Sequence, residues 1–120
     1  MNPRILIVDD EENARKTLGI GLRLEGFEVS EAGDGEQALA ALDGVPVDLA
    51  IVDLMMPGMN GLELARRMRF LHPSVRVILT SAYHLSARQI ERADVGACGF
   101  VPKPFRLEEL VVFLRDKLPV

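Results

Sequence analysis

Short apolar runs of strand length, separated by segments with helical spacing, are the feature that most restricts the fold of this chain. The longest runs cover residues 5–8, 49–52 and 75–79, and shorter candidates lie at residues 27–29 and 99–101. Runs that are apolar on both faces are typical of parallel strands buried within a sheet. The pattern therefore indicates five strands.

The segments between these runs have the apolar periodicity of helices. The stripes are formed by Ala14, Leu18 and Leu22, by Ala38, Leu39 and Leu42, by Leu62, Ala65 and Met68, and by Leu107, Leu110, Val111, Leu114 and Leu118. Helix breakers follow four of the helical segments, at Gly26, Asp43-Gly44, His72-Pro73 and Gly96. Because the crossovers are right-handed, this alternation predicts a doubly wound α/β fold, with helices on both faces of a five-stranded parallel sheet. The expected strand order is the flavodoxin-like 2-1-3-4-5.

The composition is that of one globular domain, which we expect to span residues 1–120. Of the 120 residues, 48% are hydrophobic and 27% are charged, enough to enclose one core. The net charge of −4 opposes attraction to nucleic acids and anionic membranes, so direct binding to either is not expected.

The lone Cys98 cannot form an internal disulfide and is expected to be a small buried apolar side chain. No apolar run approaches the roughly 20 residues that cross a bilayer, and a cytoplasmic location is expected.

Polar residues gather at the predicted strand ends. Asp9-Asp10 follows the first strand, Asp53 the third, Thr80 lies at the end of the fourth, and Lys103 follows the fifth. In doubly wound sheets, ligands bind beyond the carboxyl ends of the strands, where the strand order reverses. Three carboxylates brought together there repel one another unless a cation lies among them. Mg²⁺, a hard cation that prefers oxygen ligands, meets that need, and Lys103 adds a second positive charge.

Four motifs resemble one known family. The segments ILIVDDE, IVDLMMPGMNG, VILTSAY and GACGFVPKPF resemble, in order and across nearly the whole chain, the signature segments of response regulator receiver domains of bacterial two-component systems, of the chemotaxis-regulator type. Each motif alone is weak, whereas the four together at these intervals are specific. The resemblance implies phosphorelay signal transduction, with a sensor histidine kinase or a phosphotransfer protein as the donor.

The resemblance also assigns residues. It implies that Asp53 is the phosphoacceptor and that Mg²⁺ is bound by Asp10, by Asp53 and by the backbone carbonyl of Met55, with Asp9 acting through a metal-bound water. A phosphoryl group must be met by an in-line nucleophile and by positive charge on its equatorial oxygens. Water can later attack the acyl phosphate, so slow autodephosphorylation is expected. Such a domain is a switch and not a turnover enzyme.

The resemblance also implies which residues carry the signal output. Thr80 and Lys103 would hold the phosphoryl oxygens, and Thr80 with Phe100 would form the switch. The readout surface would be the fourth helix, fifth strand and fifth helix, roughly residues 86–118. Phe100 lacks the hydroxyl of the tyrosine that is common at this position, which leaves only the packing part of the switch.

Two other functions compete with this reading. An aspartyl phosphatase of the haloacid dehalogenase type also uses a strand-end Asp with Mg²⁺, but it needs a second Asp two residues later, where this chain has Met55. A receiver-like interaction module that is never phosphorylated is the stronger alternative. Such modules usually lack one of the acids or the lysine, and this chain retains them. Singly, each site residue has an ordinary structural reading, as a helix cap, turn former, strand residue or loop lysine.

The biological setting stays open between two readings. The chain is either a stand-alone regulator acting on a downstream protein, or the receiver of a longer protein with a DNA-binding or enzymatic output domain beyond residue 120. The last helical segment, LEELVVFLRDKL, lacks the Arg-rich ending seen in many DNA-binding regulators that dimerise through this face. Dimerisation of that type is not expected, although a weak homodimer remains an alternative.

Overall fold

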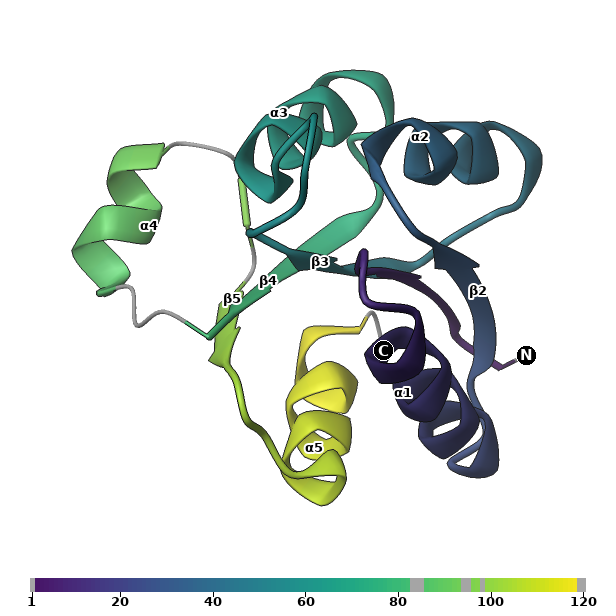
Figure 1. The fold of residues 1–120 in the computed structure, drawn as a ribbon. Helices are drawn as coiled ribbons and strands as arrows, with labels where there is room; N and C mark the ends of the chain where they lie inside the picture. Colours follow the sequence, from purple (N-terminus) through teal and green to yellow (C-terminus); the bar gives the residue numbers. More distant parts are fainter. Residues whose placement is uncertain (1, 83–85, 94–95, 98, 119–120) are drawn as a thin grey trace.

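Five strands alternate with five helices in the computed structural model, which describes residues 2–82, 86–93, 96–97 and 99–118 (Figure 1). The strands are β1 (Arg4–Val8), β2 (Glu28–Ala32), β3 (Leu49–Asp53), β4 (Arg76–Ser81) and β5 (Gly99–Pro102). The helices are α1 (Glu12–Leu24), α2 (Gly35–Gly44), α3 (Gly61–Leu71), α4 (Ala87–Ala93) and α5 (Leu107–Lys117). The predicted alternation is confirmed.

The strands form one parallel sheet in the order β2-β1-β3-β4-β5, as predicted. All five residues of β3 are buried, since it lies at the centre and is covered on both faces. Helices α1 and α5 lie on one face, and α2 and α3 lie on the other (Figure 1). The strand order reverses between β1 and β3, so the carboxyl ends of these two strands define the expected binding edge.

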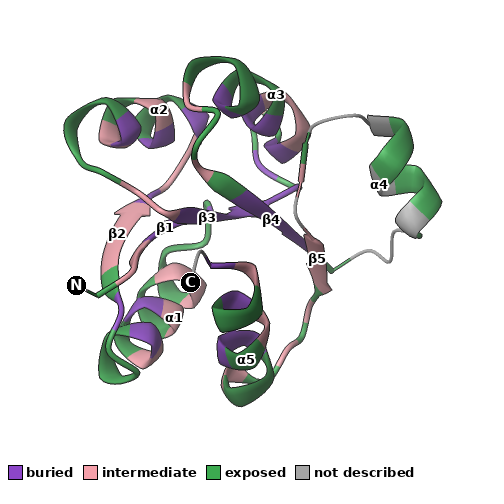
Figure 2. Cartoon of the chain, turned by 180° about the vertical axis from the view of Figure 1, so that it is seen from behind, coloured by how far each residue is buried: buried purple, intermediate pink, exposed green. Residues whose placement is uncertain are grey.

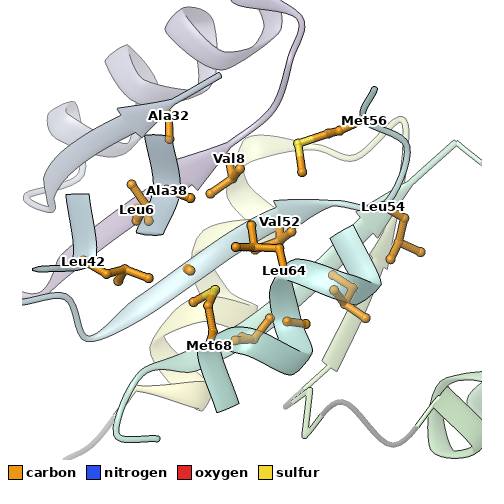
Figure 3. Packing of buried hydrophobic residues seen from close by; sticks show 14 residues of the cluster. Leu6, Val8, Ala32, Ala38, Leu42, Val52, Leu54, Met56, Leu64 and Met68 are labelled. Carbon is orange, nitrogen blue, oxygen red and sulfur yellow. The ribbon is translucent and has the colours of Figure 1, made fainter. Parts of the chain in front are cut away.

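Each face of the sheet has its own apolar core. Successive strand residues point to opposite faces, so Leu6 and Val8 pack toward α2 and α3, whereas Ile5 and Ile7 pack toward α1 and α5. Figure 3 shows the first cluster, with buried side chains from β1, β3 and α3. The buried parts of the chain follow the central strands and the inner faces of these helices (Figure 2). The two cores hold the strand ends in fixed register.

Helices α1 and α5 approach each other closely at a glycine. A Cβ atom on Gly21 would lie 2.8 Å from Cδ2 of Leu107, the first residue of α5, so a larger side chain at this position would require the Leu107 side chain to shift. This contact brings the start of α5 against α1, near the segment that follows β5.

Two sequence expectations need comment. Gly44, predicted as a breaker after the second helix, is instead the last residue of α2, because the Val45 N–H still donates to Ala41 O at 3.0 Å and closes the final turn. Cys98 lies outside the described residues. Within the described segments, no helix has the length and apolar character needed to cross a membrane.

Candidate functional site

Three aspartates meet where two neighbouring strands end. β1 and β3 run parallel with Val8 opposite Val52, so the next residues, Asp9 and Asp53, emerge at the same edge. Asp9 is 7% exposed and Asp53 is 8% exposed. Asp10 is exposed beside them, and one carboxylate oxygen from each of the three aspartates lies within 4.8 Å of the others. The structure thus brings together the three carboxylates that the sequence places at strand ends.

Lys103 reaches the same edge from beyond β5. Its backbone N–H donates to Ser81 O at 2.8 Å and so continues the pairing of β5 with β4. Its ammonium nitrogen Nζ lies 2.8 Å from Oδ2 of Asp9 and 3.3 Å from Oδ2 of Asp53. A single ammonium therefore bridges the two buried carboxylates.

Main-chain N–H groups orient the other oxygen of each buried aspartate. Glu11 N donates to Oδ1 of Asp9 at 2.9 Å, and Met55 N donates to Oδ1 of Asp53 at 3.0 Å. Both carboxylates are consequently held at two points, which fixes their rotation. Asp10 differs, since within the described part of the chain its carboxylate accepts no hydrogen bond from a protein group.

Burial and charge act in opposite directions on the two central ionisable groups. Burial raises the pKa of Asp53, and the nearby charge of Asp9 adds to that rise, against the opposing effects of the Met55 N–H and the Lys103 ammonium. Burial alone would lower the pKa of Lys103, but the hydrogen bond to Asp9 and the charges of Asp53 and Asp9 outweigh it and raise that pKa. Lys103 therefore stays protonated at neutral pH, while ionised Asp53 is less favourable than in water.

The donor set fits a hard divalent cation. Three carboxylates face one ammonium, which leaves a surplus of negative charge, and the oxygens of Asp10 have no protein partner among the described residues. Carboxylate oxygens in a small, partly open cluster are the ligands that Mg²⁺ binds while keeping several of its waters. The Met55 backbone carbonyl remains a predicted further ligand.

Thr80 lies beside the cluster, and Phe100 lies one strand further away. Thr80 is 2% exposed and pairs in register with Asp53, and its carbonyl accepts the Leu54 N–H at 2.9 Å. Phe100 is half-buried on β5 and pairs in register with Leu79. The structure places Thr80 next to Asp53, whereas the coupling of Thr80 to Phe100 stays a prediction.

The loop from β3 to α3 returns beneath Asp53 through a glycine. A Cβ atom on Gly61 would overlap the Asp53 carbonyl oxygen and would lie 2.7 Å from Cα of Leu54. The Gly61 N–H donates to Leu54 O at 3.1 Å, and the next turn is capped by Asn60, whose Oδ1 accepts the Glu63 N–H at 3.0 Å. The missing side chain is thus what lets α3 start directly behind the site.

Arg15 and Glu31 belong to the site's surroundings, and the sequence analysis missed them. Arg15 Nη1 donates to the Asp9 carbonyl oxygen at 2.8 Å, and Arg15 Nε lies 3.2 Å from Oε1 of Glu31. The available signal was the strand register, which pairs Ile7 with Glu31 and so places an acid on β2 near the end of β1. An arginine one turn into the following helix is its natural partner.

A pocket adjoins the site between α1 and the segment that leads into α5. Its volume is about 660 Å³, within the range of small-ligand and peptide clefts. The apolar part of its wall includes Ala14, Leu18, Phe105 and Leu107, and the polar part includes Asp9, Thr80 and Lys103. Asp9 and Lys103 of the site therefore form part of the wall of an otherwise largely apolar pocket.

Removing the Asp53 charge is expected to stabilise the domain in the absence of divalent ions. Asp53→Asn should raise the thermal midpoint at pH 7 in EDTA by about 4 °C, equivalent to roughly 1 kcal/mol for a domain of this size. The pKa of Asp53 is raised in the folded state, so Asp53 disfavours folding only when it is ionised. The folding stability is therefore highest, with respect to this group, below the ordinary carboxyl pKa, and it falls as the pH rises through the folded-state pKa. The difference between variant and wild type should thus shrink toward about pH 4. A lower midpoint for the variant at pH 7 would contradict this account.

Comparisons with known proteins agree with this geometry. A family model described as the response regulator receiver domain matches residues 5–115. The DNA-binding response regulator MtrA of Mycolicibacterium smegmatis is 39% identical over 118 residues, which cover 98% of this chain and 51% of that protein. The crystal structure of response regulator protein TrrA from Thermotoga maritima, in complex with Mg(2+)-BeF, is 37% identical with a TM-score of 0.85, covering 97% of this chain and 99% of that one. Chemotaxis protein CheY4 of Vibrio cholerae is 30% identical with a TM-score of 0.91, covering 98% and 100%.

The chain belongs to the response regulator receiver domain family of two-component systems. Members of this family are phosphorylation switches that partner with histidine kinases and bind Mg²⁺ at an acidic pocket. The chain spans about half the length of the curated relatives it matches, 51% in the case of MtrA.

Proposed function

We propose that this domain accepts a phosphoryl group on Asp53 from a histidine kinase or a phosphotransfer protein, in a Mg²⁺-dependent reaction. The observation that carries the proposal is the contact of a buried Asp53 with Lys103 at the edge where Asp9 and Asp10 also lie. A nucleophilic carboxylate, a fixed ammonium and an oxygen-rich cation site are the three parts that phosphoryl transfer needs.

Asp9, Asp10, Asp53 and the Met55 backbone carbonyl would hold the metal. When bound, Mg²⁺ neutralises negative charge on the carboxylates and on the incoming phosphoryl oxygens. Asp10 is the clearest candidate ligand, because it is exposed and its carboxylate accepts no hydrogen bond within the described residues. Asp9 is already bound to the Glu11 N–H and to Lys103, which suits it to a supporting role.

In the proposed transfer, an Asp53 carboxylate oxygen attacks phosphorus and forms a P–O bond. The P–N bond to the donor histidine breaks, and its electron pair leaves with the imidazole nitrogen. Lys103 Nζ, 3.3 Å from Asp53 Oδ2, is close enough to donate to a phosphoryl oxygen, and the Thr80 hydroxyl would bind another. Slow attack by water would return Asp53 to the free carboxylate, so the domain would act as a self-resetting switch and not as a turnover enzyme.

The donor would dock over the pocket between α1 and the segment leading into α5. This pocket has largely apolar walls, and Asp9 and Lys103 are among its polar lining residues. An apolar helix face of the donor could pack there while its phosphohistidine reaches Asp53. The same packing would exclude water from the reacting atoms.

Output would pass through Thr80 and Phe100 to the surface of α4, β5 and α5. Phosphoryl contact with the Thr80 hydroxyl would bias one of two arrangements of this surface, and Phe100 packing would follow. The partner that binds this surface would be a downstream protein or an output domain. A relative of this chain is named a DNA-binding response regulator. We do not expect residues 1–120, which we take as a single receiver domain, to bind nucleic acid directly. A weak homodimer is compatible with the proposal, but not one of the type that uses an Arg-rich α5 surface.

Mg²⁺ is expected to raise the thermal midpoint, because it binds the native state and not the unfolded chain. At about ten times its Kd the ion should contribute roughly 1.4 kcal/mol, or about 6 °C. Asp10→Asn should remove most of this gain while leaving the midpoint in EDTA unchanged or higher, because among the described residues the Asp10 carboxylate has no hydrogen bond or ion pair to lose.

Glu12→Gln is the matched control, since Glu12 is an exposed acid two residues away whose ion pair to Lys16 is 3.7 Å long. It should keep the full Mg²⁺ effect. Equal Mg²⁺ effects in Asp10→Asn and the wild type would exclude Asp10 as a ligand. Covalent transfer to Asp53 is tested separately, by the intact mass of the protein after incubation with acetyl phosphate and Mg²⁺.

A further inference from the structure

The Arg15 side chain is held next to the acidic cluster by two polar contacts. It lies in the first turns of α1 with its side chain 15% exposed. Its Nη1 donates to the Asp9 carbonyl oxygen at 2.8 Å, and its Nε lies 3.2 Å from Glu31 Oε1 on β2. Gly33 lies close to the guanidinium, since a Cβ atom at Gly33 would lie 3.3 Å from Arg15 Nη1. The guanidinium therefore links the β1–α1 turn to the end of β2.

The Asp9 carbonyl belongs to the peptide group that joins Asp9 to Asp10. Because that group is planar, fixing its oxygen also fixes the plane from which the Asp10 Cα emerges. The carboxylate of Asp10 accepts no protein hydrogen bond in the described residues, so its direction depends on this backbone. The Glu11 N–H donates to Oδ1 of Asp9 across the same turn, whereas Glu11, the N-cap of α1, makes no side-chain cap hydrogen bond, so Arg15 is the side chain that fixes the Asp9 carbonyl oxygen.

We propose that Arg15 is a positioning residue for the metal-binding cluster, held in place by Glu31. It touches neither the metal nor the phosphoryl group; it orients the peptide that presents Asp10. This inference rests on the proposed Mg²⁺ site and names the residue that preorganises it. Residues behind metal ligands commonly change metal affinity by about 10-fold or more when removed.

Charge and position predict opposite effects for this residue. Arg15 is a cation near three carboxylates, so if its charge were all that mattered, removing it would strengthen Mg²⁺ binding. If it orients the turn, removing it weakens Mg²⁺ binding, because Asp10 must then be ordered when the ion binds. The sign of the change in Kd therefore separates the two roles.

The experiment is calorimetric titration of Mg²⁺ into the folded 120-residue chain, comparing the wild type with Arg15→Met and Arg15→Lys. Arg15→Met is expected to raise the Mg²⁺ Kd about 10-fold. Arg15→Lys keeps the charge and one donor, so it should recover part of the affinity. Since Lys and Arg carry the same charge, any difference in Mg²⁺ Kd between the wild type and Arg15→Lys reports geometry. This comparison tests the inference even if Arg15→Met does not fold.

Arg23→Met is the matched control. Arg23 is a second cation near Glu31, at 3.5 Å, but its backbone contact is with Val29 O and not with Asp9. Its Mg²⁺ Kd should stay within about twofold of the wild type. The inference would be overturned, with the metal site left intact, if Arg15→Met bound Mg²⁺ as tightly as the wild type or more tightly. The same conclusion would follow if the wild type, Arg15→Lys and Arg15→Met had equal Kd values. Absence of Mg²⁺ binding by the wild type would overturn the metal site and this inference with it.

Discussion

Asp53→Asn is expected to abolish the phosphate adduct that the wild type forms with acetyl phosphate and Mg²⁺. The amide offers no nucleophilic carboxylate oxygen, while its oxygen can still accept the Met55 N–H that orients Asp53 in the wild type at 3.0 Å. The loss should therefore be chemical and not a loss of fold. Intact-mass spectrometry should show one added phosphate on the wild type and none on the variant.

Asp48→Asn is the matched control for this substitution. Asp48 precedes β3 at the opposite edge of the sheet, where its Oδ2 accepts the Arg4 N–H at 2.8 Å, so it should leave adduct formation unchanged. A wild-type sample in EDTA should form little or no adduct. An adduct of equal yield on Asp53→Asn would rule out Asp53 as the acceptor, and no adduct on any protein would favour a receiver-like module that binds without phosphorylation.

The fold could be predicted because local pattern and global topology agree. The central strands are apolar on both faces, and only burial between two helical layers explains such runs. The handedness of the crossovers then limits the arrangement to a few topologies. Helix ends were less certain, as Gly44 shows: glycine can still adopt helical angles, and the last hydrogen bond of α2 depends on where Val45 is held by the chain that follows.

The core of the site could be predicted for the same reason. In a parallel sheet the carboxyl ends of strands meet at one edge, so Asp9, Asp53 and Thr80 had to be neighbours once the strands were placed. Lys103 follows from its position just beyond β5. The roles of these residues in chemistry are a further step, and they rest on the proposed function.

The supporting contacts of the site were not predictable from spacing. The bond from Arg15 to the Asp9 carbonyl joins a helix side chain to a backbone atom, and such bonds leave no periodic signal in a sequence. Its geometry exists only when α1 has packed against β2 and Glu31 has fixed the guanidinium. The candidate phosphoacceptor and metal ligands can thus be predicted from the strand ends, whereas the residues that orient them can be identified only in the folded structure.

Lys103→Met is expected to slow phosphorylation of Asp53 by about 100-fold at saturating Mg²⁺. The ammonium bridges Asp9 and Asp53 at 2.8 and 3.3 Å, so it is already placed where charge develops on a phosphoryl oxygen. Its loss also leaves two buried carboxylates facing each other. Because the pKa of Lys103 is raised, its stabilising contribution is complete below its ordinary pKa and is lost only as the pH rises above the folded-state value. The variant should therefore melt at a lower temperature at pH 7.

The rate must be separated from folding and from metal affinity. Initial adduct formation should be followed by intact mass well below the melting temperature of each protein, with Mg²⁺ raised until the rate no longer changes, since removing a cation would itself favour Mg²⁺ binding. Lys16→Met makes the same change at an exposed lysine paired with Glu12 at 3.7 Å and should phosphorylate at the wild-type rate. A Lys103→Met rate within about threefold of the wild type would mean that the ammonium only offsets repulsion between Asp9 and Asp53 in the resting domain. A 100-fold loss with intact Mg²⁺ binding would instead assign Lys103 to the transition state, because the variant would retain both nucleophile and metal and lack only the fixed positive charge.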